Sequence, residues 1–488
     1  MNKLYLLPLL LLNLLWAGPL LVQAQSKTLA SVPFSYLPGK SEDGYNKRVE
    51  HKTLPLSNSE FILLSRQSAD TYAVVKYNTN LKKIWEAPLA LSKPETIEAF
   101  ISTKDAAVVI THTEATQGKQ QLYAYRITLN DGKVQEKVLL LEAPAKSRRA
   151  GVAASPDGTK LLAFRYHSNS NMQIQDISGV IYDDALAPIK EASYNLSDIP
   201  AILTADVQVN NTGEQYISLI SDNMNRLTVR QYNLLNKEVK VMSVLVGGVF
   251  DGQKVYIQDS KFSLMPDNTL YGAVFTASEA TGQYYSLKAV RFDFETEDMV
   301  FAEEFKFTPT YLAKINAADK SKGPKPEQLE DIYLSDLFLT PEQKLVVLAE
   351  KKYTEGGENT PYYAKELYLF GYDEYMNSTW SSVLMKNQKA PASEAFDAIS
   401  YNAFVNGNTL DLLTKEELKG KNDLYLHRIN VASGAATDPQ PLDLNVVKDK
   451  NIAYVKEFTA WLTDKNIITV VRTAKEAKEL QLSHILIK

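Results

Sequence analysis

The sequence SPDGTKLLAFR (155–165) combines a tight turn with the strand that follows it. Pro156 presets φ for the turn, Gly158 can take a positive φ, and the apolar run after them is typical of a buried strand. The same arrangement, a short polar turn between two extended apolar runs, recurs eight times along the chain. The eight turns are SNSE (57–60), STKD (102–105), SPDG (155–158), NNTG (210–213), MPDN (265–268), TPEQ (340–343), VNGN (405–408) and LTDK (462–465). They lie roughly 45 to 75 residues apart, which suits a repeat of four strands.

A repeat of this length predicts an all-β fold, a single β-propeller of four-stranded antiparallel blades. In each unit the recurring turn joins the first strand (a) to the second strand (b). A second hairpin, usually an aromatic residue followed by Asp or Asn, joins the third strand (c) to the fourth (d) in seven units, as at Tyr232-Asn233 and Tyr372-Asp373. We therefore expect eight blades. Seven is the alternative, if the weak first or fourth unit is not a blade.

The eighth unit ends within strand c, at residues 480–487, so the C-terminus supplies no outer strand for it. An open sheet edge favours aggregation, and propellers commonly close the ring with a strand from the other end of the chain. Residues 28–37 are extended and apolar, and they precede residues 49–56, the expected first strand of blade one. We expect residues 28–37 to close the ring as this N-terminal strand.

The stretch 155–165 resembles the repeat of WD40-like, TolB-type β-propellers, in which Pro presets the turn and Gly takes the positive φ. The resemblance is close over these eleven residues. The other units share the strand–turn–strand pattern of the repeat but not its residues. It implies the propeller architecture and no particular activity, because propellers serve enzymes, scaffolds and binding proteins alike.

The first 24 residues differ in composition from the rest of the chain. Lys3 is their only charge, residues 4–15 are apolar, and Val22-Gln23-Ala24 supplies the small residues that a signal peptidase requires. We predict a signal peptide over residues 1–24, a propeller over residues 25–488, and export to the periplasm or the cell exterior. An uncleaved membrane anchor is the alternative. The absence of Cys suits a bacterial envelope protein, and Gln25 after the cut resembles exported proteins of the Bacteroidetes.

Charge and motifs narrow the classes of function. The 53 basic and 58 acidic residues give a formal net charge of -5 without a long block of one sign, which argues against a nucleic-acid partner. The chain contains neither G-x-S-x-G nor H-E-x-x-H, and its five His never approach the spacing of a metal motif. We therefore expect no cofactor and no metal, and a binding protein rather than an enzyme. The alternative is a carbohydrate-active enzyme, a glycosidase or lyase, because two blades can bring a pair of carboxylates together in the channel.

Loop lengths indicate which face of the propeller binds. The a–b and c–d turns are short, whereas the b–c and d–a connections are long, above all the insert at residues 309–330. These long connections emerge on one side of a propeller, and binding surfaces commonly lie on loops over a rigid scaffold. The insert carries Lys314, Lys320, Lys322 and Lys325. A short helix over residues 326–332 and an irregular solvated loop are the two alternatives for it.

Two sets of residues on this face are candidate ligand-binding groups. The first set is basic, because strand b ends in a positive or protonatable residue in six blades. Six such groups around the mouth of the channel would attract an anion. They are Arg66, His112, Arg165, Lys351, Lys415 and Arg472. Since exposed charges contribute little to folding, we expect reversal of Arg165 and Arg472 to leave the stability almost unchanged.

The second set is aromatic and lies in the b–c loops of blades five and six. Tyrosines there offer flat faces with polar edges to sugars or peptide side chains, and packing between blades is the alternative role. They are Tyr284, Tyr285, Tyr353, Tyr362 and Tyr363. The sequence thus predicts an exported, noncatalytic propeller that binds a protein, a polysaccharide or another anionic partner through its loop-rich face.

Overall fold

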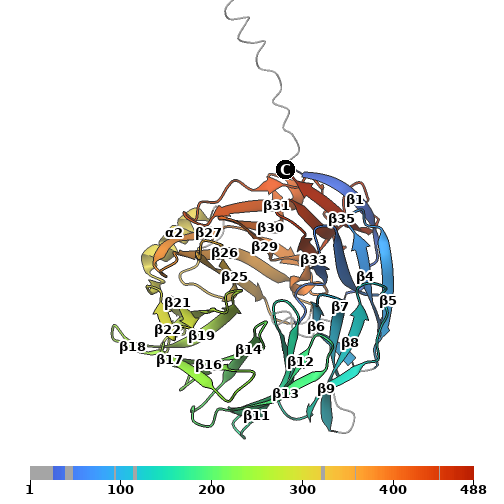
Figure 1. The fold of residues 1–488 in the computed structure, drawn as a ribbon. Helices are drawn as coiled ribbons and strands as arrows, with labels where there is room; N and C mark the ends of the chain where they lie inside the picture. The colour runs from blue at the N-terminus through green and yellow to red at the C-terminus, as the bar shows by residue number, and fades with distance from the viewer. Residues whose placement is uncertain are drawn as a thin grey trace, which may run out of the picture.

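The computed structural model describes residues 26–38, 48–92, 95–113, 118–319, 325–357, 359–449, 451–476 and 478–488. The expected signal peptide lies outside these residues, as do Gln25, Lys320 and Lys322. The described residues form eight antiparallel sheets arranged in a ring (Figure 1). The prediction of an all-β propeller with eight blades is therefore confirmed, and the seven-bladed alternative is wrong.

The first four blades are regular meanders, in which each strand pairs with the next strand along the chain. Blade one contains β2 (Thr53–Pro55), β3 (Glu60–Arg66), β4 (Thr71–Asn78) and β5 (Lys83–Ala90). Blade two contains β6 (Glu95–Ser102), β7 (Ala106–Thr113), β8 (Lys119–Thr128) and β9 (Val138–Pro144). Blade three contains β10 (Gly151–Ala154), β11 (Lys160–Ser168), β12 (Ile174–Asp183) and β13 (Pro188–Asn195). Blade four contains β14 (Thr204–Val209), β15 (Gln215–Ser221), β16 (Arg226–Tyr232) and β17 (Val239–Leu245).

Blades five and six have interrupted outer strands, and blade five has an extra short strand that pairs with β19. Blade five contains β18 (Gly248–Phe250), β19 (Gln253–Leu264), β20 (Leu270–Ser278), β21 (Tyr284–Asp293), β22 (Asp298–Phe301) and β23 (Phe305–Lys306). Blade six contains β24 (Ile332–Leu339), β25 (Leu345–Thr354), β26 (Tyr362–Tyr372), β27 (Ser378–Leu384) and β28 (Gln388–Ala390). Blade seven follows the short 3-10 helix η1 (Ala395–Ala398) and contains β29 (Tyr401–Asn406), β30 (Thr409–Leu418), β31 (Lys421–Asn430) and β32 (Gln440–Pro441).

Blade eight joins the two ends of the chain. It contains β33 (Tyr454–Trp461), β34 (Asn466–Val471), β35 (Leu480–Ile487) and, as its outer strand, β1 (Ser26–Phe34). β1 pairs antiparallel with β35, so the prediction that N-terminal residues close the ring is confirmed. The first strand of blade one, β2, is shorter than the expected 49–56.

Side chains of the recurring turn hold its backbone in place. In blade three, Asp157 accepts hydrogen bonds from the backbone N–H of Thr159 at 2.9 Å and from the Ser155 hydroxyl at 2.7 Å. Gly158 has a φ of +71°, and a Cβ atom there would lie 2.3 Å from the carbonyl oxygen of Ser102. Only glycine fits this position. Seven of the eight predicted turns join the first strand of a blade to its second, and in blade five, where β18 precedes, the turn joins β19 to β20.

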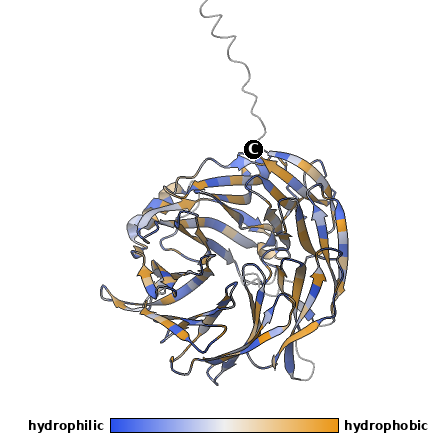
Figure 2. Ribbon diagram, viewed as in Figure 1, coloured by the Kyte–Doolittle hydropathy of each residue, from blue (hydrophilic) through white to orange (hydrophobic). Residues whose placement is uncertain are grey.

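The hydrophobic core consists of layers between blades. Among the described residues, eight clusters of buried apolar side chains each join two neighbouring blades. Figure 2 shows hydrophobic residues along the strands all around the ring. Between blades six and seven, Trp380 on β27 donates its indole N–H to the carbonyl oxygen of Val431 at 2.7 Å. Because each layer joins its neighbours, the ring is a rigid support for the loops on its faces.

Candidate functional site

The six predicted bases lie at equivalent places in their blades. Five of them lie on the second strand, and Arg472 directly follows the second strand of blade eight. Their side chains nevertheless have different environments. The expected ring of six free positive charges around the channel mouth is not formed, for the reasons that follow.

His112 and Arg165 are engaged away from the channel mouth. The His112 side chain is 2% exposed, and its Nε2 atom lies 3.0 Å from Oε1 of Gln120. Burial lowers the pKa of His112, which favours its neutral form. Arg165 donates from Nη1 to the carbonyl oxygen of Glu142 at 2.9 Å and from Nε to Oγ of Ser178 at 3.1 Å. Since Glu142 belongs to the outer strand of blade two, Arg165 lies between blades, and its predicted place at the channel mouth is wrong.

Arg66 and Arg472 hold loops in place. Arg66 donates from Nη1 to the carbonyl oxygen of Pro38 at 2.7 Å. Arg472 is 5% exposed and forms an ion pair with Asp449, with Nη1 2.8 Å from Oδ2. It also donates from Nε to the carbonyl oxygen of Ile452 at 3.1 Å. This burial and pairing contradict the expectation that Arg472 is an exposed charge whose reversal leaves the stability almost unchanged.

Lys415 and Lys351 complete the basic set. Burial lowers the pKa of Lys415, the nearby Glu394 carboxylate opposes this shift, and the Arg472 charge adds to it. Lys351, by contrast, lines a cavity on blade six. Among the six bases, Lys351 is thus the residue that the structure places in the groove described next.

The insert contains a helix, α2 (Pro309–Ala318). Thr308 caps it by accepting a hydrogen bond from the backbone N–H of Tyr311 at 3.2 Å, and Pro309 begins the helix. Tyr311 and Ile315 are buried in the core between blades five and six. Of the two alternatives for the insert, the helix at 326–332 is wrong, and an irregular loop throughout the insert is wrong too. The helix lies earlier, because the stronger start signal is the Thr-Pro pair at 308–309 and the buried residues follow it at helical spacing.

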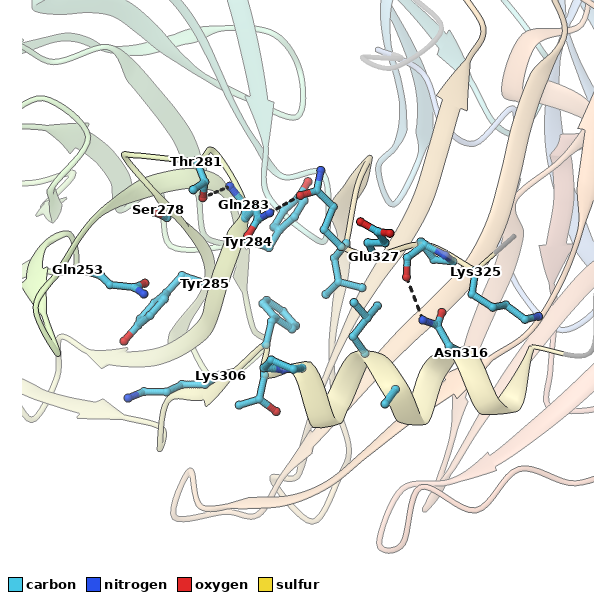
Figure 3. Close-up of a pocket in the computed structure, with 18 residues that line it drawn as sticks. Gln253, Ser278, Thr281, Gln283, Tyr284, Tyr285, Lys306, Asn316, Lys325 and Glu327 are labelled. Carbon is cyan, nitrogen blue, oxygen red and sulfur yellow. Dashed lines mark hydrogen bonds between the residues drawn. The ribbon is translucent and has the colours of Figure 1, made fainter. Parts of the chain in front are cut away.

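The helix α2 and residues 325–329 form a groove over blades five and six, here called the α2 groove (Figure 3). One cavity of about 780 Å³ lies between α2 and the start of β21. A second cavity of about 560 Å³ lies along β25, β26 and residues 385–387. Lys325 and Pro326 line both cavities, so the two adjoin.

The first cavity combines tyrosines with amide side chains. The Tyr284 hydroxyl donates to the carbonyl oxygen of Ile332 at 2.6 Å, and burial raises the pKa of this hydroxyl. The Tyr285 hydroxyl lies 3.2 Å from Oδ2 of Asp251. Both tyrosines line the cavity, and in Figure 3 they lie toward the start of α2, whereas Asn316 lies toward its other end. Three further amide side chains line it, namely Gln253, Gln283 and Gln328.

The second cavity lies beside a pair of stacked tyrosines. Tyr353 on β25 and Tyr363 on β26 are register partners, and their ring centroids are 4.9 Å apart with planes 14° from parallel. The Nζ atom of Lys351 is 6.0 Å from the centroid of Tyr353. The Nζ atoms of Lys365 and Lys389 are 5.3 Å and 5.5 Å from the centroid of Tyr363. These five residues are called the lysine–tyrosine cluster below.

Tyr362 differs from the other four predicted tyrosines. Its ring meets the ring of Phe396 edge-on at 4.9 Å, within a small apolar cluster that includes Ala364 and Ala390. Tyr362 therefore has the packing role that the sequence left as an alternative. Tyr284, Tyr285 and Tyr353 line the groove, and Tyr363 stacks beside it.

The enzyme alternative requires carboxylates in the channel, and five inner strands carry one or more. These acidic residues include Glu98, Asp206, Asp259, Asp336 and Glu457. Glu98 forms ion pairs with Arg48 and Arg149, and the Glu98–Arg149 distance is 2.7 Å. Glu457 forms an ion pair with Lys52. Two of these five carboxylates are thus neutralised by basic residues.

The other three carboxylates accept hydrogen bonds. Asp336 accepts from the Tyr401 hydroxyl at 2.5 Å, and Asp259 accepts from the backbone N–H of Leu334 at 2.8 Å. Asp206 accepts from Nε2 of Gln208 at 2.7 Å. Desolvation by surrounding protein atoms raises the pKa of both Asp206 and Asp259, although Asp206 is exposed and Asp259 half-buried. Each of the five acidic residues therefore has a partner within the protein.

The part of the chain that the structure describes contains no group of three or more His, Asp or Glu side chains arranged to hold a metal ion. No helix in it combines the length and the apolar character needed to cross a bilayer.

Several groove residues were not singled out by the sequence. Lys365 and Lys389 belong to the lysine–tyrosine cluster, and Gln253, Gln283 and Gln328 line the first cavity. The alternation of side chains along a strand could have identified two of them. Lys351 and Lys365 each lie two residues from a tyrosine on the same strand, and so lie on the same face of the sheet as that tyrosine. Lys389 has no such signal, because it meets Tyr363 only through the pairing of β28 with β26.

Comparisons with known proteins concern the fold alone. No family model matches the chain, and no curated protein matches it. The solved structure of polysaccharide lyase Uly1 is similar with a TM-score of 0.41 and 9% identity, over 82% of this chain and 91% of that chain. The β-propeller domain of the Trilobed protease from Pyrococcus furiosus has a TM-score of 0.35 and 12% identity, over 80% and 93%. The Nup133 β-propeller domain of Vanderwaltozyma polyspora has a TM-score of 0.39 and 9% identity, over 80% and 99%. The propeller fold of this chain is shown by its own eight blades and not by these likenesses.

Proposed function

We propose that this protein is an exported, noncatalytic binding propeller that holds a protein or carbohydrate partner in the α2 groove. The observation that carries this proposal is the pair of adjoining cavities of about 780 and 560 Å³, which tyrosine, amide and lysine side chains line on the loop-rich face. Binding sites commonly combine such a concave surface with a few polar groups that orient the ligand.

The anchoring of α2 supports a preformed site. Tyr311 and Ile315 fix the helix to the core between blades five and six, and Thr308 caps its first turn. A wall held in this way loses little conformational freedom when a ligand binds, so more of the contact energy contributes to affinity.

A substitution that fills the groove tests the proposal. Ala313 lies on α2, is exposed and lines the first cavity, so Ala313→Trp places an indole ring in the groove. Ala317 is exposed on the same helix but does not line the cavity, so Ala317→Trp is the matched control. Arrays of glycans and peptides identify a ligand for the mature protein, and calorimetry then measures its affinity. We expect Ala313→Trp to weaken binding at least about tenfold, which corresponds to about 1.4 kcal/mol.

The Ala317→Trp control and the midpoint of thermal unfolding show whether weaker binding comes from the filled groove or from a damaged fold. Ala317→Trp is expected to bind within twofold of the wild type, and both variants to unfold at the wild-type temperature. A ligand whose affinity is the same for all three proteins binds elsewhere, and the α2 groove is then not its site.

A carbohydrate-active enzyme is the second candidate, and Asp206 is the observation that favours it. The surrounding protein atoms desolvate this carboxyl group and raise its pKa, as in a general acid, although the residue is exposed to solvent. The assay is release of reducing ends or unsaturated sugars from a panel of polysaccharides. Turnover that Asp206→Asn abolishes and Ala313→Trp leaves intact would replace the binding proposal with the enzyme.

A further inference from the structure

We propose that the ligand of the α2 groove is an acidic polysaccharide, and that the lysine–tyrosine cluster binds one of its carboxylate or sulfate groups. This inference rests on the proposed function and adds the chemical class of the ligand. It is carried by three ammonium groups, those of Lys351, Lys365 and Lys389, that converge on one pair of stacked rings.

In the described part of the chain, no close ion pair holds the three lysines of the cluster, although carboxylates line the same cavity, among them Glu366, Glu416 and Glu417. Among the described residues, no carboxylate oxygen forms an ion pair within 4.0 Å of Lys351, Lys365 or Lys389, whereas the neighbouring Lys325 pairs with Asp319 at 2.8 Å. The Nζ atom of Lys365 instead donates a hydrogen bond to Oδ1 of Asn387. An oxyanion between these ammonium groups would accept charge-assisted hydrogen bonds, which are stronger than neutral ones.

The pKa of Lys365 reflects the same crowding of charge. Burial lowers this pKa most, the Lys351 and Lys389 charges lower it further, and the Glu366 and Asp319 carboxylates oppose the shift. A bound anion would reduce the repulsion among the three lysines. The cluster therefore gains more from an anionic group than an isolated surface lysine would.

The strands hold the cluster in this geometry before any ligand arrives. Tyr353, Tyr363 and Lys389 lie on three successive strands as register partners. The pairing of β25 with β26 shifts register between Glu350 and Lys352, where Lys351 alone faces Lys365 and Glu366, and irregularities of this kind redirect side chains. The hydroxyls of Tyr353 and Tyr363 make no hydrogen bond to another described residue, so they are available to a ligand.

The other half of the groove has the chemistry of a sugar site. Gln253, Gln283 and Asn316 carry amide groups, which donate and accept hydrogen bonds at once, as sugar hydroxyls do. Tyr285 adds an aromatic face with a polar edge beside them. Because this cavity adjoins the one beside the cluster, a linear chain can place hydroxyls in the first cavity and an acidic group in the second.

The same arrangement disfavours a nucleic acid. Single-stranded nucleic acids are held by bases that stack on open aromatic faces and by a basic groove along the backbone. Here Tyr353 and Tyr363 stack on each other, and lysines lie over them. The net charge of -5 also provides no general attraction for a polyanion, so recognition depends on the groove itself.

The test compares defined polymers on the full mature chain. The probes are polygalacturonate and chondroitin sulfate as carboxylated and sulfated glycans, dextran as a neutral glycan, and single-stranded DNA and polyglutamate as other polyanions. The variant is the triple substitution K351Q/K365Q/K389Q. The matched control is K104Q/K237Q/K465Q, which removes three exposed lysines from the short turns of the opposite face and changes the net charge equally.

We expect one of the two acidic glycans to bind, with an affinity that falls as salt rises. Because each charged contact contributes about one order of magnitude in affinity, the triple variant should bind at least about 100-fold more weakly. The control should bind within twofold. If the triple variant unfolds, Y353F/Y363F serves instead, since it removes two hydroxyls and keeps the stacked rings.

The remaining outcomes overturn the inference and separate it from the proposed function. Equal binding of dextran, or binding of DNA or polyglutamate with the same dependence on the three lysines, rejects an acidic polysaccharide as the ligand. A neutral glycan or peptide that Ala313→Trp displaces rejects this inference but retains the α2 groove as a binding site. An acidic glycan that neither the triple variant nor Ala313→Trp affects rejects both.

Discussion

Ser26 and Ile487 lie opposite each other in adjacent strands of one sheet, although they stand near the two ends of the chain. The pairing continues along β1 to Phe34, which lies opposite Leu480 and packs its ring edge-on against Phe458 at 5.0 Å. The pairing of β1 with β35 therefore joins residues that are far apart in the sequence, and the ring closes only when this pairing forms.

Removal of β1 tests this closure. A chain that begins at Arg48 leaves the edge of β35 unpaired and exposes the apolar cluster around Phe458. We expect loss of cooperative thermal unfolding, or loss of soluble protein, relative to a chain that begins at Ser26. Addition of a peptide with the sequence of residues 26–34 should restore part of the cooperativity. A shortened chain that melts like the longer one would mean that β1 is dispensable for closure.

Substitution by Ala is expected to destabilise the fold more at Gly434 than at Gly420, another glycine in a turn of blade seven. Both Gly434 and Gly420 have a positive φ, but a Cβ atom at Gly434 would lie 2.3 Å from the Trp380 ring, whereas the space at Gly420 is open. Ala at either position adds backbone strain of about 1 kcal/mol. Gly434→Ala should cost about 1–3 kcal/mol more, because it overpacks the layer between blades six and seven.

Urea denaturation measures this difference. Equal midpoints for Gly434→Ala and Gly420→Ala would show that the Trp380 contact is looser than the structure indicates.

Lys386 and Glu350 form a buried ion pair within blade six. The Nζ–Oε1 distance is 2.7 Å, both side chains are at most 1% exposed, and the Ser400 hydroxyl donates to Glu350 at 2.6 Å. Lys386→Met should destabilise the fold by about 3–5 kcal/mol, because it leaves a buried carboxylate without its partner. The double variant K386M/E350Q should recover most of this loss in urea denaturation. If the double variant is as unstable as the single one, the lost stability comes from altered packing and not from the unpaired charge.

The ion pair of Asp449 with Arg472 predicts a pH dependence of stability. The hydrogen bond from Arg472 lowers the pKa of the Asp449 carboxyl group from 3.8 to about 2. Because the pKa is lower in the folded protein, the pair stabilises the fold fully above the unfolded pKa, and this contribution is lost as the pH falls toward 2. Wild type should therefore be more stable than Asp449→Asn at pH 5 to 7, and the difference should shrink below pH 4.

Thermal unfolding at a series of pH values, at one salt concentration, measures this difference. Asp449→Asn in the background of Arg472→Met is the control, because that background lacks the guanidinium. A difference between wild type and Asp449→Asn that does not change with pH would contradict the shifted pKa.

Local signals along the chain predicted the architecture, because they act within a few residues. Turns such as Ser155-Pro156-Asp157-Gly158 close through their own side chains, so their recurrence marks each blade wherever it lies. The closure by N-terminal residues was predictable too, since a unit that lacks its outer strand needs one from elsewhere.

Only the tertiary structure decided which side chains meet. A base at the end of a strand has several partners within reach, and the neighbouring blade determines that Arg165 contacts Glu142 and Arg472 pairs with Asp449. The α2 groove likewise depends on register and packing, which bring Lys389 beside Tyr363 and the insert helix over blades five and six. The sequence by itself determined the turns and most of the strands and favoured eight blades over seven, because local backbone preferences and the hydrophobic pattern encode them. The candidate site depends on contacts between distant residues, and these exist only once the ring has closed.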